Sequence, residues 1–297
     1  MSSLIIEPPV LNLSDSVRQQ KVLDRTSTLR IMLDPESKKR LQEIFYDEME
    51  LGLSDNPRKK STLMMENTFV PELPNGKEEG KYMALDLGGT NFRVLMVIYK
   101  DGKVVDEIVQ QYAVDEKHRF CPGDELFDFL ADCVKDFIEK YKIDDKYIQM
   151  GFCFSFPMYH EALDVGILYR WTKSFNCPDV VGKDVVKGLN DALDRKLKDK
   201  EVKIYVPAII NDTTGTLIQG AFLDQRTAIG LILGTGGNAS YIEKIENIKK
   251  FKGETKDKYE IINTEWGSFG DDGTTKFLKT EWDTRTDEQT HHPNSFT

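Results

Sequence analysis

Two glycine-rich segments, each directly after an apolar segment, are the residues of this sequence best suited to binding phosphate. The first contains, in order, Asp86, Leu87, Gly88, Gly89, Thr90, Asn91 and Arg93. The glycines let the backbone approach a polyphosphate closely, and the threonine and asparagine after them can donate hydrogen bonds to its oxygens. Asp86 can hold Mg²⁺ directly or through water. An ordinary hairpin turn has the same glycines, so this segment alone leaves both interpretations open.

The second glycine segment, Gly234, Thr235 and Gly236, follows the apolar run Leu231–Leu233. It matches neither a Walker A loop nor the dinucleotide-binding fingerprint. Three glycines within Gly234–Gly237 cost backbone entropy, and contact with a ligand would be a reason for them, although a tight hairpin is the alternative. Two such turns, one in each half of the chain, predict a clasp on either side of a phosphate chain.

A third pattern places Asp212 just past an apolar segment, Lys203–Ile210, and at the start of a predicted helix. A carboxylate in that position could act as a general base toward a substrate hydroxyl. Aspartate and asparagine are also common helix caps, so Asn211-Asp212-Thr213 alone leaves the role of Asp212 open.

Three further segments combine small polar groups with aromatic side chains: Phe154–Pro157, Arg170–Phe175 and Asn263–Gly273. Recognition of a neutral polyol needs several directional partners for hydroxyls in a partly dry pocket. A carboxylate beside an aromatic ring, as in Glu265-Trp266, suits a bidentate hold on adjacent hydroxyls. Each segment taken singly is also typical of a core residue followed by a loop.

The surrounding pattern predicts an α/β protein. A helix is expected from Pro35, capped by Asp34 and ended at Gly52. Strands at 81–86, 92–99 and 104–114, a helix at 124–141 and a strand at 148–156 follow. A weaker copy of this order comprises a strand at 203–210, a helix at 213–223 and strands at 227–233 and 240–243. This repetition predicts a duplicated unit with a cleft between its copies.

Composition excludes several classes of protein. The 297 residues have a formal net charge of −10, which disfavours binding to nucleic acid or an anionic membrane. Four separated cysteines with no C-x-x-C pair favour neither a common zinc site nor a disulfide framework. The N-terminus lacks a signal-peptide pattern and no apolar run is long enough to span a bilayer, so a cytoplasmic location is expected.

Taken in order, the motifs resemble those of eukaryotic hexokinases over about 35–287. The resemblance implies a two-lobed, actin-like (ribonuclease H-like) α/β fold. It implies an N-terminal helical segment (1–75), a small lobe (76–210) and part of a large lobe (211–297). It also implies ATP and Mg²⁺ as cofactors and phosphorylation of the 6-hydroxyl of glucose or a related hexose.

The resemblance also assigns roles to individual residues. The first and second glycine segments match the family's two phosphate motifs. Asp212 falls where the family has its catalytic base, and Lys173 where it holds sugar and offsets charge. The remaining sugar-binding positions are Ser155, Thr172, Asn211, Asn238 and Glu265.

The same resemblance has departures and rivals. Gly237 and Ser240 replace a small polar residue and a cysteine. The family continues past this point with another sugar-binding glutamate and the adenosine-binding part, so an incomplete large lobe with one uncovered sheet face is expected. One alternative is therefore a non-catalytic hexose-binding or regulatory relative, or an inactive fragment that lacks the adenosine site. Another is a bacterial-type sugar kinase, which the set Ser155, Thr172-Lys173 and Glu265 disfavours.

Overall fold

The fold is that of a computed structural model that describes residues 16–32, 34–56, 59–89, 91–234, 236–252 and 255–290, without the side chains of 25–32. The chain consists of two compact units. One unit combines Met1–Glu50 with Ser268–Thr297, and the other is Leu51–Gly267.

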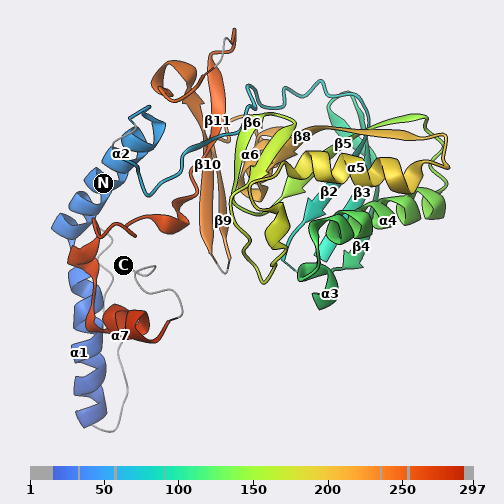
Figure 1. Cartoon of the computed structure of the whole chain (residues 1–297). Helices are drawn as coiled ribbons and strands as arrows, with labels where there is room; N and C mark the ends of the chain where they lie inside the picture. Colours follow the sequence, from blue (N-terminus) through green and yellow to red (C-terminus); the bar gives the residue numbers. More distant parts are fainter. Residues whose placement is uncertain are drawn as a thin grey trace. The chain divides into compact units, whose positions relative to one another are not determined.

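The first unit is helical (Figure 1). It contains α1 (Ser16–Met32), most of α2 (Pro35–Leu53), η4 (Lys276–Leu278) and α7 (Glu281–Gln289). Asp34 caps α2, because its Oδ1 accepts from the amides of Glu36 and Ser37 at 2.9 and 3.0 Å. The ring of Phe45 on α2 meets Phe269 edge-on, with 5.1 Å between the centroids.

A mixed five-stranded sheet forms the larger part of the second unit. Its strands, in spatial order, are β4 (Lys103–Ala113), β3 (Asn91–Lys100), β2 (Gly80–Leu87), β5 (Tyr147–Phe154) and β8 (Lys203–Ile210). Strands β2, β5 and β8 are parallel, so their carboxyl ends meet at one edge of the sheet. That edge carries most of the residues that could bind a ligand or take part in a reaction.

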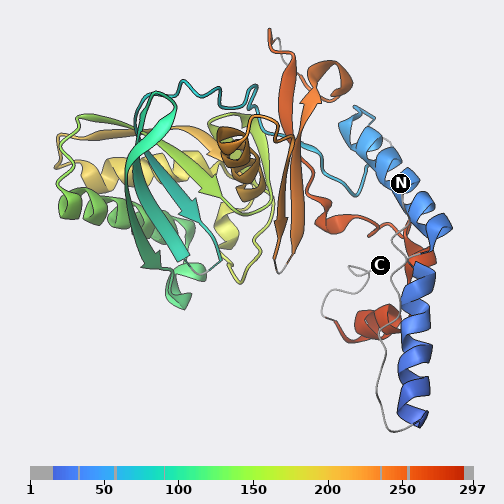
Figure 2. The same cartoon turned by 180° about the vertical axis from the view of Figure 1, so that it is seen from behind.

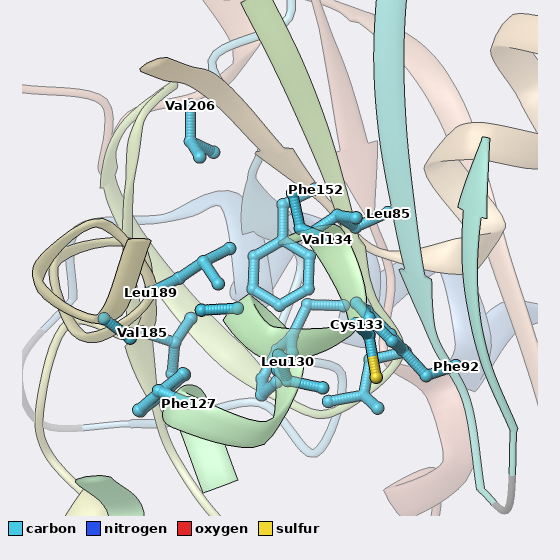
Figure 3. Close-up of a cluster of buried hydrophobic side chains, with 14 of the residues drawn as sticks. Leu85, Phe92, Phe127, Leu130, Cys133, Val134, Phe152, Val185, Leu189 and Val206 are labelled. Carbon is cyan, nitrogen blue, oxygen red and sulfur yellow. The ribbon is translucent and has the colours of Figure 1, made fainter. Parts of the chain in front are cut away.

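Two amphipathic helices cover one face of this sheet, α4 (Gly123–Tyr141) and α5 (Val185–Leu197). Figure 3 shows Leu130 and Val134 of α4 and Leu189 of α5 gathered around Phe152 of β5. All four side chains are at most 1% exposed. The parallel strands are therefore held by a closely packed apolar layer, which fixes the position of their ends.

A four-stranded antiparallel sheet completes the second unit, as Figure 2 shows from behind. Its order is β1 (Glu66–Asn67), β11 (Tyr259–Asn263), β10 (Gly237–Lys244) and β9 (Ile229–Leu233). Helix α6 (Asp212–Leu223) packs against it so closely that a Cβ at Gly230 would lie 2.6 Å from the Thr213 carbonyl oxygen. The remaining elements are α3 (Glu116–Arg119), β6 (Met158–Ala162), β7 (Val165–Leu168), η1 (Pro178–Val180), η2 (Ile245–Asn247) and η3 (Trp266–Ser268).

Most predicted elements are present within a few residues of their expected bounds. The predicted end of the first long helix at Gly52 is wrong, because α2 continues to Leu53. The glycine has a different reason: a Cβ there would lie 2.4 Å from Cγ of Met65 and 2.7 Å from the Leu63 carbonyl oxygen. Four elements, β6, β7, α5 and β11, were not predicted from the sequence.

The lobe boundaries expected at 75/76 and 210/211 stay a prediction.

Among the described residues, no helix combines the length and the apolar character needed to cross a bilayer.

Candidate active site

Asp212 lies where β8 passes into α6. The preceding residue, Asn211, is the N-cap of α6, because its Oδ1 accepts from the amide of Thr213 at 2.9 Å. Asp212 is the first residue of the helix, and its side chain is 31% exposed. The sequence left open whether Asp212 caps the helix or has a chemical role. Asn211 is the cap, so the carboxylate of Asp212 is not used for capping.

A lysine lies beside this carboxylate. Nζ of Lys173 is 3.6 Å from Oδ2 of Asp212. Lys173 and Ser174 both have left-handed backbone angles, with φ of 53° and 61°, a conformation that costs energy in residues other than glycine. Such strain is common in segments that hold a functional side chain in place.

An aromatic cluster supports the loop that carries Lys173. Trp171 stacks on Phe175 with 5.4 Å between the centroids, and Phe156 meets both rings edge-on. The indole Nε1 of Trp171 donates to the Cys177 carbonyl at 2.7 Å. In the segment 170–175, the aromatic side chains thus pack together beneath an exposed turn. Thr172 and Lys173 lie on that turn.

The first glycine turn lies against Lys173. A Cβ added at Gly89 would lie 3.5 Å from the Cβ of Lys173, an ordinary van der Waals distance. Neither Gly88 nor Gly89 has a left-handed φ, and the nearest atom to a Cβ at Gly88 is 3.7 Å away. The chain's own geometry therefore does not require glycine at either position, which favours a ligand as the reason. Thr90 lies outside the described residues.

Asp86 and Arg93 face one another across the β2–β3 pair. They are directly opposite in register, and Nη1 of Arg93 lies 2.8 Å from Oδ2 of Asp86. The described residues contain no group of three or more metal-binding side chains.

Ser155 and Cys153 connect the first glycine turn to Asp212. The amide of Ser155 donates to the Leu87 carbonyl at 3.3 Å. The pKa of the Cys153 thiol is raised, mainly by burial and further by the carboxylates of Asp86 and Asp212. Both acids thus lie close enough to one buried atom to influence its ionisation, which places them at the same edge of the sheet.

Three asparagine amides converge on Glu265. Its Oε1 accepts from Nδ2 of Asn263 at 2.8 Å, of Asn238 at 3.3 Å and of Asn211 at 3.5 Å. The pKa of Glu265 is raised, first by burial and also by the charge of Asp212, whereas the Asn263 hydrogen bond lowers it. The bond from Asn211 joins this cluster directly to the residue before Asp212.

The second glycine turn joins β9 to β10. The amide of Gly234 donates to the carbonyl of Gly236 at 2.8 Å, and no atom lies within 4 Å of a Cβ added at Gly236. Thr235 lies outside the described residues. A buried hydrogen bond of 3.1 Å between the hydroxyls of Thr214 and Ser240 ties β10 to α6, and so fixes Asn238 relative to Asp212.

The structure therefore brings Ser155, Thr172, Lys173, Asn211, Asp212, Asn238 and Glu265 to one region with Asp86, Leu87, Gly88 and Gly89. Whether the two glycine turns face one another across a phosphate chain stays a prediction. Asn263 was not among the predicted site residues, although it makes the shortest of the three bonds to Glu265. Arg170, whose positive charge lowers the pKa of Glu265, was not among them either. The two-residue spacing of Asn263 and Glu265 at the end of an apolar strand was the available signal.

Comparison with known proteins shows the family to which the chain belongs. A family model described as Hexokinase matches residues 26–222, and a second Hexokinase model matches 228–297. The chain is 40% identical to Hexokinase-1 of Bos taurus over 255 residues and 40% identical to Hexokinase-2 of Homo sapiens over 248 residues. It spans 85% and 83% of its own length in these matches, but only 27% and 26% of theirs.

Solved structures give the same result. The hexokinase of Schistosoma mansoni in complex with glucose superposes with a TM-score of 0.75 at 37% identity, over 86% of this chain and 56% of that one. Another hexokinase crystal structure gives a TM-score of 0.73 at 28% identity. The chain therefore has the two-lobed, actin-like α/β fold with a partial large lobe. It belongs to the hexokinase family.

Proposed function

We propose that this chain phosphorylates the 6-hydroxyl of glucose and related hexoses with ATP. The observation that carries the proposal is the position of Asp212. Its carboxylate lies 3.6 Å from the Lys173 ammonium, follows a residue bonded to Glu265, and shares an edge of the sheet with the first glycine turn. A carboxylate so placed can serve a sugar on one side and a phosphate on the other.

The sugar side is supplied by a mixed set of donors and acceptors. Glu265 is partly buried and held by three amides, so it offers a rigid acceptor to neighbouring hydroxyls. The amides of Asn211 and Asn238 and the hydroxyls of Ser155 and Thr172 complete the polar set. Directional partners around a partly dry pocket are what a neutral polyol requires.

Asp212 would accept the proton of the 6-hydroxyl as its oxygen attacks the γ-phosphorus in line. The Lys173 ammonium would offset the negative charge that develops on the transferred group. A positioned general base contributes about 10²–10⁴ in rate. Closure of the two lobes around sugar would keep water, a competing nucleophile, from the phosphorus.

ATP and Mg²⁺ belong to the same proposal. The amides of the two glycine turns would hold the phosphate oxygens, with Asn91 and Arg93 beside the first turn. Asp86 suits Mg²⁺ held through water, because this ion commonly uses one or two carboxylates and completes its shell with waters and substrate phosphates. When bound, the ion would neutralise charge on the phosphates. A cytoplasmic location also remains part of the proposal.

A coupled assay for ADP release in the presence and absence of glucose tests the proposal on this chain. Sugar-dependent release that Asp212→Asn abolishes is the expected result. Calorimetry with glucose and then with ATP separates the alternatives. Binding of glucose without binding of ATP would instead favour a non-catalytic hexose-binding relative.

A further inference from the structure

Glu66 is a buried acid behind the proposed sugar site. It lies on the two-residue strand β1, which pairs antiparallel with β11, and only 9% of its surface is exposed. Its directly opposite residue in this pairing is Asn263. Directly opposed residues share one face of a sheet, with Cβ atoms about 5 Å apart.

Because of this pairing, one side chain, that of Asn263, stands between Glu66 and Glu265. The side chain of Asn263 shares its face of the sheet with Glu66, and its Nδ2 donates to Oε1 of Glu265 at 2.8 Å. The three side chains thus form a row, with a carboxylate at each end and an amide between them. The charge of Glu265 acts on Glu66 through space and raises the pKa of its carboxyl.

Lys250 and Glu260, two further charged groups near Glu66, make hydrogen bonds to the backbone and none to Glu66. Nζ of Lys250 donates to the Met64 carbonyl at 2.7 Å, and the carboxylate of Glu260 accepts from the amide of Phe69 at 2.9 Å. Tyr159 of β6 is the remaining titratable neighbour. Within the described part of the chain, no hydrogen bond or ion pair reaches the carboxylate of Glu66.

Burial without a hydrogen bond or a close ion pair makes the charge of Glu66 sensitive to pH. The pKa of this carboxyl is raised to about 7, mainly by burial and further by the charge of Glu265, whereas the charge of Lys250 lowers it. Glu66 therefore changes from neutral to ionised near neutral pH, next to a residue that the proposed reaction needs.

We propose that Glu66 is a positioning residue that sets the hexose affinity of this site through Asn263 and Glu265, and that its ionisation weakens sugar binding. The inference rests on the hexose binding proposed above. A negative charge on Glu66 repels the charge of Glu265 and competes for the amide hydrogens of Asn263. Both effects make the position of the Glu265 carboxylate less fixed, and this carboxylate is the proposed acceptor for sugar hydroxyls.

Calorimetric titration of the full chain with glucose at about pH 6 and about pH 8.5 tests the proposal. The expected result for the unaltered chain is affinity about fivefold weaker at the higher pH. Glu66→Gln, which mimics the neutral acid, should keep the higher affinity at both values. Glu260→Gln is the matched control, because Glu260 is a buried acid of the same sheet that lies on β11 but does not contact Glu265. It should leave the pH dependence in place.

A pH dependence that survives unchanged in Glu66→Gln would overturn the proposal. An equal loss of affinity at both pH values in this variant would also overturn it, since that pattern indicates a purely structural role. A sugar-free readout separates this failure from failure of the proposed function. The ¹³C carboxyl signal of Glu265 should show a second titration step near neutral pH that Glu66→Gln removes. If no hexose binds at any pH, the proposed function fails, and this signal still decides whether Glu66 and Glu265 are coupled.

Discussion

Replacement of Glu66 by glutamine should stabilise the folded chain at alkaline pH. The pKa of this carboxyl is about 7 in the folded state, against 4.5 for an unperturbed glutamate. A folded state whose carboxyl has a raised pKa binds the proton more tightly than the unfolded chain does. Its stability therefore falls as pH rises between these two values, and the loss is complete above the folded pKa.

The magnitude follows from the difference between the two values. They are about 2.5 pH units apart, and each unit corresponds to about 1.4 kcal/mol. Ionised Glu66 therefore costs the folded state about 3.5 kcal/mol at about pH 8.5, and the uncharged amide of Glu66→Gln removes that cost. For a chain of this size, such a gain raises the midpoint of thermal unfolding by roughly 7–14 °C.

Thermal and urea unfolding followed by circular dichroism at about pH 5 and about pH 8.5 would measure the effect. The variant and the unaltered chain should be close in stability at the lower pH and well separated at the higher one. Glu72→Gln, at an exposed position, is the control and should change stability by less than about 0.5 kcal/mol at either pH. Equal stability of Glu66→Gln and the unaltered chain at the higher pH would refute the argument from burial.

Three further predictions concern the site and its frame. Asp212→Asn should lower sugar-dependent ADP release by at least about 10²-fold while calorimetry still detects glucose, and unchanged turnover would exclude Asp212 as the base. Glu265→Ala should weaken glucose binding by about 1–3 kcal/mol in the same titration, because it leaves sugar hydroxyls without their acceptor; unchanged affinity would remove Glu265 from the sugar site. Gly52→Ala should destabilise the fold by about 1–3 kcal/mol through its clash with Met65, whereas Gly236→Ala, with open space around it, should spare stability and raise the KM for ATP. Equal unfolding midpoints for the two glycine variants, or an unchanged KM, would contradict this assignment.

The sequence predicted the elements with strong periodicity and clear turn residues. Asp101-Gly102 joins two strands in left-handed conformations, as the hairpin prediction requires, and β8 has the predicted bounds. Helix α5 is an exception, because it was not predicted although its apolar residues recur at helical spacing and Asp184 caps its start. The strand β1 is only two residues long and is defined by its partner β11, so no local pattern could reveal it.

The candidate site could be predicted as a set of residues but not as a network. Single motifs indicated where a carboxylate or a glycine turn lies, and the order of the motifs indicated the family. The bond between Asn263 and Glu265 and the ion pair of Asp86 with Arg93 depend on side-chain direction in the folded chain. The burial of Glu66 depends on a strand pairing across nearly two hundred residues of sequence, and no periodicity records such a pairing.

Asn211 uses both ends of one amide group, and this restricts which residue can stand there. Its oxygen caps α6, and its nitrogen donates toward Glu265. Aspartate has the same shape and would keep the cap, but it would set a second negative charge against Glu265. Serine would also cap the helix, yet its shorter side chain could not reach the glutamate. Among the residues that commonly cap helices, asparagine alone combines both contacts, so a screen of all substitutions at this position should recover very few functional variants.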